Sequence, residues 1–207
     1  MARGGLALLA LAALGLGAAP SAGAAPGKST AAPQRAAAGP AVPQDRGFYT
    51  IRAVHSGKCI GPYGDNLSRA VQLVQQPCDG RLAQVVRLNS LGEHRSGTGD
   101  WETYYSVQSP YGYCWASSSW IDGLVTRPLH ERATLEACNS LTWKHVAFTF
   151  RGNPSSGYHM ADFTSWTDGQ SGTCLGVDGQ NMNDNAGVIY WHCGDQGQNM
   201  KFQLIPV

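Results

Sequence analysis

One short cysteine motif occurs three times in this chain, and no other feature restricts its fold as strongly. Each copy consists of a glycine, a variable residue, a cysteine and a large apolar residue. The copies are residues 57–60, 112–115 and 172–175. A further cysteine follows each copy about twenty residues later, at Cys78, Cys138 and Cys193. Recurrence at an interval of 55 to 60 residues predicts one supersecondary unit that is built three times.

The N-terminal part of the chain predicts export. Arg3 precedes an unbroken run of Leu, Ala and Gly over residues 6–19, and small residues at 22–24 suit a signal peptidase. We therefore expect a signal peptide over residues 1–24, a secreted, extracellular protein and no membrane span, because the run is too short for one. The Ala/Pro-rich residues 25–46 are expected to form a flexible linker.

The remaining residues, 47–207, have the length of one domain. The repeat divides this domain into units of about 47–100, 101–153 and 154–207. Six cysteines in an exported protein indicate disulfides, and they allow 15 connectivities. The repeat favours pairing within each unit: Cys59–Cys78, Cys114–Cys138 and Cys174–Cys193. A zinc site would need ligands two to four residues apart, a spacing that these cysteines lack, so we expect no metal and no cofactor.

Short alternating segments predict an all-β domain with about four strands in each unit. Every unit begins with an aromatic residue that opens an alternating strand, and the motif cysteine lies in the next strand. Glycine-rich turns separate the strands, as at residues 61–66 and 178–181. Units of this kind have exposed strand edges when they stand alone, and a closed barrel of three units removes those edges.

Charge and motif content restrict the class of function. The net charge is +1 and only 14% of residues are charged, so we expect no nucleic-acid partner, which would require a clustered basic face. No His-Glu-x-x-His or Gly-x-Ser-x-Gly motif occurs, and disulfides account for every cysteine. We therefore expect no catalytic residues and no enzyme activity.

The order of these features resembles the repeat of the ricin B-type lectins. An aromatic-x-aliphatic strand precedes each Gly-x-Cys-aliphatic motif, and a strand ending in an aromatic residue closes the third unit. The resemblance covers residues 47–207 and implies a β-trefoil with one disulfide in each unit. The family's Gln-x-Trp motif is eroded, because Gln84-Val85-Val86 takes its place in the first unit and Met200-Lys201-Phe202 in the third.

The resemblance also implies one possible sugar site in each unit, built from three positions. A carboxylate two residues after the first cysteine would bind hydroxyls, an aromatic residue two before the second cysteine would stack on the sugar ring, and an Asn before the Gln-x-Trp motif would add a hydrogen bond. The acid position holds Gly61, Ala116 and Gly176, the stacking position holds Gln76, Glu136 and Trp191, and the Asn position holds Ala83 in the first unit and Asn199 in the third. The third unit therefore keeps two of the three elements.

We expect a non-catalytic carbohydrate-binding domain whose best site is in the third unit, with a glycan or polysaccharide as partner. The site would contain Trp191, Asn199 and Asp178, which lies two residues past the vacant acid position. Trp120 and Trp166, in Ser-rich loops, are candidates for further contacts. The missing acids leave open a trefoil that binds protein instead, as a toxin's receptor-binding subunit or as a protease inhibitor.

Overall fold

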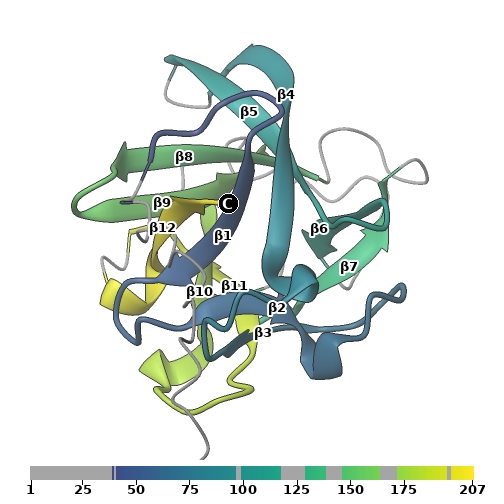
Figure 1. Cartoon of the computed structure of the whole chain (residues 1–207). Helices are drawn as coiled ribbons and strands as arrows, with labels where there is room; N and C mark the ends of the chain where they lie inside the picture. Colours follow the sequence, from purple (N-terminus) through teal and green to yellow (C-terminus); the bar gives the residue numbers. More distant parts are fainter. Residues whose placement is uncertain are drawn as a thin grey trace, which may run out of the picture. The chain divides into compact units, whose positions relative to one another are not determined.

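Twelve strands form one sheet in the described part of the chain (Figure 1). The structure is a computed structural model, and it describes residue 39 and residues 41–96, 99–117, 129–138, 146–163, 172–194 and 197–207. The strands are β1 (Phe48–Ala53), β2 (Cys59–Pro62), β3 (Leu73–Gln76), β4 (Val85–Arg95), β5 (Trp101–Gln108), β6 (Tyr113–Ser117), β7 (Ala133–Ala137), β8 (Ala147–Asn153), β9 (Gly157–Asp162), β10 (Thr173–Val177), β11 (Val188–His192) and β12 (Lys201–Pro206). Short 3₁₀ turns are η1 (Tyr63–Asp65), η2 (Leu82–Gln84), η6 (Asp178–Gln180) and η7 (Gln198–Met200).

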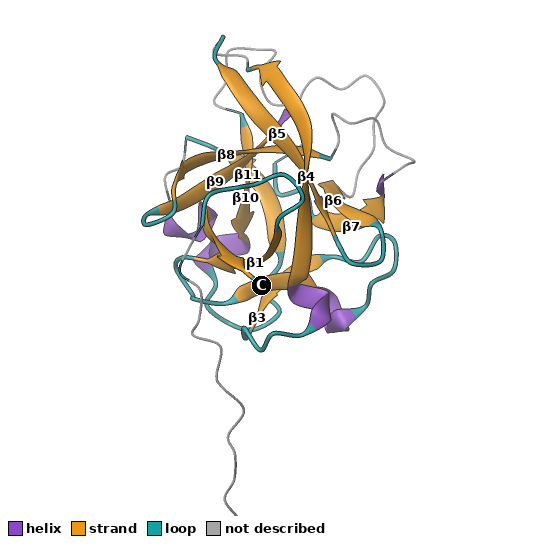
Figure 2. Ribbon diagram, turned by 45° about the horizontal axis from the view of Figure 1, so that its top comes forward, coloured by secondary structure: helices purple, strands orange, loops and turns teal. Residues whose placement is uncertain are grey.

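The outer two strands of each unit close a barrel. β1 pairs with β4, β4 with β5, β5 with β8, β8 with β9, β9 with β12, and β12 returns to β1. The inner strands of each unit form a hairpin, β2–β3, β6–β7 or β10–β11. A six-stranded barrel with three hairpins is the β-trefoil, so the expected all-β fold with four strands per unit is confirmed (Figures 1 and 2).

Alternating side chains of the barrel strands fill one core. In β1, Tyr49, Ile51 and Ala53 are buried while the residues between them are more accessible. Ile51, Leu88 and Phe148 have no exposed surface and belong to the same cluster. Fully burying an apolar side chain of this size contributes about 1.5–3 kcal/mol, so this core holds the three units in place.

A ring of backbone contacts joins the three hairpins. The residue at one equivalent position of each unit has a left-handed backbone, with φ of 64° at Ala70, 63° at His130 and 62° at Asn185. Each donates its N–H to the next unit in the ring, Ala70 to Leu135 O (2.7 Å), His130 to Tyr190 O (3.0 Å) and Asn185 to Gln75 O (2.8 Å). Each unit therefore places one short segment beside a strand of another unit.

Three disulfides join the strands of the hairpins to the segments that follow them. They connect Cys59 to Cys78, Cys114 to Cys138 and Cys174 to Cys193, with sequence separations of 19, 24 and 19 residues. The expected pairing within each unit is confirmed. Among the described residues no helix is long and apolar enough to cross a membrane, and no group of three His, Cys, Asp or Glu side chains is placed to hold a metal ion.

The folded part of the chain begins before residue 47. Ala41 donates its N–H to Leu204 O (2.8 Å), Tyr49 Oη donates to Val42 O (3.1 Å), and Asp45 accepts the N–H of Ser90 (2.7 Å). Residues 41–46, which composition places in the flexible linker, are therefore bound to the barrel. Composition did not reveal this, because the contacts use mainly backbone groups. The expected signal peptide lies outside the described residues.

Candidate functional site

A pocket of about 550 Å³ opens at the third unit, and all three residues expected to bind sugar there line it. Trp191 comes from β11, Asn199 from η7 and Asp178 from η6. The lining residues are His130, Gly176, Val177, Asp178, Gly179, Gln180, Ile189, Trp191, Gly197, Asn199 and Met200. Residues from three elements thus meet at one surface.

Trp191 is held by the strand pair β10–β11. It lies opposite Cys174 in the register, and the Cys174–Cys193 disulfide follows directly. Its indole is half-buried and packs against a small cluster of Ala161, Cys174 and Met200. One part of the ring therefore has a fixed support, while another part lines the pocket. A supported, partly accessible indole is a suitable platform for a flat apolar surface.

Asn199 is oriented by two neighbours. Its Nδ2 donates to Val177 O at 2.8 Å. Its Oδ1 lies beside Gly197, because a Cβ atom built there would be only 2.3 Å from this oxygen. With its amide nitrogen bound to the backbone, Asn199 offers a carbonyl oxygen, which is a hydrogen-bond acceptor, next to the pocket-lining Gly197.

Space is tight at the vacant acid position of the third unit. A Cβ atom at Gly176 would approach Met200 Cγ to 3.0 Å, since η7 packs closely over β10. Asp178 follows the strand in the turn η6, where its N–H donates to Gly187 O at 2.9 Å. Its side chain is exposed, and among the described residues its carboxylate has no hydrogen bond or ion pair. An unpaired carboxylate therefore lies at the rim of the pocket.

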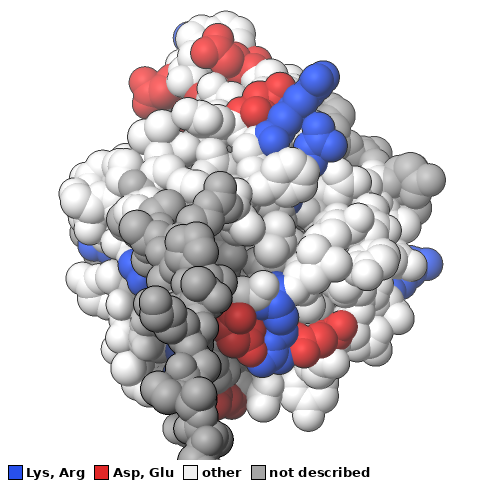
Figure 3. Space-filling model, in the orientation of Figure 1, with Lys and Arg blue, Asp and Glu red and all other residues white. Residues whose placement is uncertain are grey.

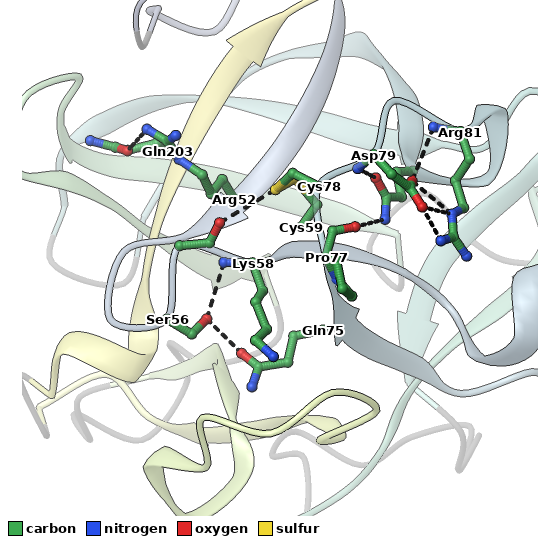
Figure 4. The surroundings of a disulfide bond; sticks show 12 residues. Arg52, Ser56, Lys58, Cys59, Gln75, Pro77, Cys78, Asp79, Arg81 and Gln203 are labelled. Atoms are coloured by element: carbon green, nitrogen blue, oxygen red, sulfur yellow. Dashed lines mark hydrogen bonds and ion pairs between the residues drawn. A yellow bond between two sulfur atoms is a disulfide. The ribbon is translucent and has the colours of Figure 1, made fainter.

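The equivalent surface of the first unit is occupied by the protein's own charges. A smaller cavity of about 320 Å³ lies there, with Gln76 in place of Trp191 and Arg81 in place of Gly197. Arg81 binds Asp79 (Figure 4). It also binds Asp65 at 2.7 Å, and the two contacts raise the pKa of its guanidinium. Gln76 is buried and donates to Pro62 O at 3.2 Å. This surface therefore lacks an aromatic platform at the stacking position.

In the second unit, an ion pair occupies the stacking position. Glu136, at its stacking position, is buried and forms an ion pair with Arg69 of the first unit, with 2.7 Å between Oε2 and Nε. Trp120 and Trp166, the two loop candidates, lie outside the described residues. Within the described part of the chain, the third unit is thus the one in which an open pocket lies at a stacking position that carries an aromatic residue.

Sequence reasoning did not place His130 at the pocket. His130 belongs to the second unit, but its ring lies 4.2 Å from the indole of Trp191, measured between centroids, with 59° between the planes. No local motif marks this residue, because the ring of contacts between units brings it to the third. The equivalence of His130 with Ala70 and Asn185 becomes visible only when the three units are superimposed in register.

The face shown in Figure 3 is mostly uncharged. Some of its basic residues lie next to acidic ones and others stand alone. Several basic side chains of the described residues form ion pairs: Arg69–Glu136, Arg81–Asp65, Arg81–Asp79 and Arg151–Glu102. A clustered basic surface, which a nucleic acid would require, is not seen on this face.

Comparison with known proteins places the fold. No known family model and no curated protein matches the sequence. Among solved structures, the designed threefold-symmetric protein ThreeFoil is similar, with 19% identity over 77% of this chain and 99% of that one and a TM-score of 0.61. The Rhizoctonia solani agglutinin is similar at 15% identity over 81% of this chain and 99% of its own, with a TM-score of 0.59. The Macrolepiota procera ricin B-like lectin, solved in complex with lactose, shows 13% identity over 81% of this chain and 100% of its own, with a TM-score of 0.57. The chain therefore has the β-trefoil fold of the ricin B-like lectins.

Proposed function

We propose that this protein is a secreted, non-catalytic carbohydrate-binding module whose site is the pocket of the third unit. The observation that carries the proposal is the meeting of Trp191, Asn199 and Asp178 in one open pocket. The equivalent positions of the first and second units hold Gln76 and Glu136, which are buried and bound to the protein itself.

The chemistry of the pocket suits a sugar ring. The apolar face of a pyranose stacks on an indole, and its hydroxyl groups donate hydrogen bonds to oxygen acceptors at the edge. Trp191 supplies the platform, while Asn199 Oδ1 and the Asp178 carboxylate supply acceptors. Among the described residues that line the pocket, Asp178 carries a carboxylate, which would repel an acidic sugar. These features favour a neutral glycan, and lactose, the ligand of one similar lectin, is a natural first probe.

The extracellular part of the proposal rests on two features. Residues 1–24 have the pattern of a signal peptide. Three disulfides tie the trefoil together, and such bonds persist in oxidising compartments outside the cytosol. An exported protein with these disulfides would encounter the glycans of cell surfaces and of the surrounding matrix.

The test is an array of neutral and acidic oligosaccharides and polysaccharides, lactose included, probed with the oxidised full chain. Trp191→Ala is compared with Trp101→Ala, which removes a tryptophan that is 70% exposed on β5 and does not line the pocket. The expected result is binding that Trp191→Ala abolishes and Trp101→Ala preserves. Binding that survives Trp191→Ala would contradict the site and direct attention to Trp120 and Trp166. An array without any binding would contradict the lectin and favour recognition of a protein.

A further inference from the structure

His130 reaches the pocket from another unit, and its backbone is fixed there. Its N–H donates to Tyr190 O at 3.0 Å, and the N–H of Tyr190 donates to Glu131 O at 2.8 Å. Arg132 forms a bridge with Ile189 just beyond. His130 therefore stands next to Trp191 because a short stretch of paired backbone on both sides of Tyr190 holds it, and not because a loose loop rests on the surface.

The backbone at this position does not demand a histidine. The equivalent residues are Ala70 and Asn185, which have nearly the same positive φ and make the same type of hydrogen bond to another unit. His130 is exposed, so its ring adds nothing to the core. The fold thus accepts three different side chains here, so the backbone alone does not account for the imidazole.

The two rings form a corner. With 4.2 Å between centroids and 59° between planes, the imidazole touches the indole without lying flat on it. Both rings line the same pocket. A pyranose stacked on the open part of Trp191 would meet the imidazole at its side, where the ring limits the room for substituents and offers a nitrogen to a hydroxyl group.

We infer that His130 is a specificity-determining residue of this pocket, so that the site is shared between the second and third units. The inference rests on the proposed carbohydrate binding at Trp191. His130 forms the side wall of the site, Trp191 its floor, and the acceptors Asn199 and Asp178 lie on the third unit. The wall selects among neutral sugars by the size and direction of the substituent that points toward the second unit.

The experiment uses the residues that the chain already carries at equivalent positions. His130→Ala and His130→Asn copy Ala70 and Asn185, which have the same left-handed backbone, so both variants should keep the fold. The matched control is His192→Ala, since the His192 ring lies 5.8 Å from that of Trp191 but His192 does not line the pocket. Thermal unfolding of each full-chain variant shows that it is folded, and the array described above gives the binding profile.

Both His130 variants should weaken binding to the best neutral glycan about three- to tenfold and change the rank order of glycans on the array, while His192→Ala keeps the wild-type profile. Wild-type profiles for His130→Ala and His130→Asn, together with lost binding in Trp191→Ala, would overturn the inference and leave the proposed function standing. Wild-type binding by Trp191→Ala, or no binding by the wild-type protein, would overturn both. If His130→Ala does not fold, the profile of His130→Asn decides.

Discussion

Arg69 of the first unit and Glu136 of the second form an ion pair, with 2.7 Å between Nε and Oε2. Glu136 occupies the position at which the third unit has Trp191, and its side chain is only 5% exposed. The hydrogen bond to Glu136 raises the pKa of the Arg69 guanidinium. A buried carboxylate requires a partner of opposite charge. The same position of the repeat therefore holds a buried ion pair, through Glu136, in the second unit and an aromatic residue that faces an open pocket, Trp191, in the third.

Arg69→Ala should destabilise the protein, because it leaves the buried Glu136 carboxylate without its cation. We expect the midpoint of thermal unfolding to fall by about 2–4 °C at neutral pH. Arg46→Ala is the control, because the Arg46–Asp45 pair is 3.8 Å long and both side chains are exposed. Adding Glu136→Gln to Arg69→Ala should recover most of the loss. Equal midpoints for Arg69→Ala and the wild type would show that Glu136 does not depend on this pair.

Two disulfides of equal loop length allow stability to be separated from binding. Cys59–Cys78 and Cys174–Cys193 both span 19 residues, so replacing either pair by serine should lower the free energy of unfolding by about 3 kcal/mol. Cys174 and Cys193 also pack beside Trp191, and their loss should weaken glycan binding as well. Denaturant titration and glycan titration of the two double variants, at a temperature where both are folded, test this difference. Equal losses of binding would mean that the third disulfide has no special part in holding Trp191.

The fold could be predicted from the sequence because its determinants are local and repeated. Each unit carries its own cysteine pair and its own alternating strands, and threefold repetition leaves a closed barrel as the natural arrangement. The family resemblance, read along one unit, pointed to Trp191, Asn199 and Asp178, and these residues line one pocket. That they bind a sugar stays a prediction.

Contacts between units could not be predicted from the sequence. Backbone hydrogen bonds between units place His130 beside Trp191 and Arg69 beside Glu136, and no local sequence pattern predicts these side-chain contacts. Residues 41–46 are a related case, since the N–H of Ala41 donates to the carbonyl of Leu204, near the other end of the chain. Single-sequence patterns describe periodicity along the chain, whereas these contacts depend on which segments the closed barrel brings together.

Gly197→Ala should displace Asn199 without straining the backbone. Gly197 has φ of −62°, which alanine adopts readily, but a Cβ atom there would lie 2.3 Å from Asn199 Oδ1. Asn199 must then turn away and lose its hydrogen bond to Val177 O. We expect glycan affinity to fall up to about tenfold, as for the loss of one hydrogen bond, with little change in thermal unfolding. Asn199→Ala should show the same loss, and Gly61→Ala, whose Cβ would have ordinary 3.4 Å contacts, should show none. Full affinity in Gly197→Ala would mean that the Asn199 orientation is not used.

His159 should make the stability of the trefoil depend on pH. Burial, and then the charge of Lys201, lower the pKa of this imidazole, and Lys201 and Arg151 flank it on the neighbouring strands. Above the usual histidine pKa of about 6.5, His159 is neutral in both states and has no effect. As the pH falls below that value, the unfolded chain takes up a proton that the folded chain resists, so the free energy of unfolding decreases until the lowered folded-state pKa is passed.

Denaturant titrations between neutral and mildly acidic pH should therefore show a decline in the free energy of unfolding. This decline should be smaller in His159→Gln and only partly reduced in Lys201→Gln, because burial is the larger cause of the lowered pKa. The same decline in His159→Gln as in the wild type would assign the pH dependence to other groups.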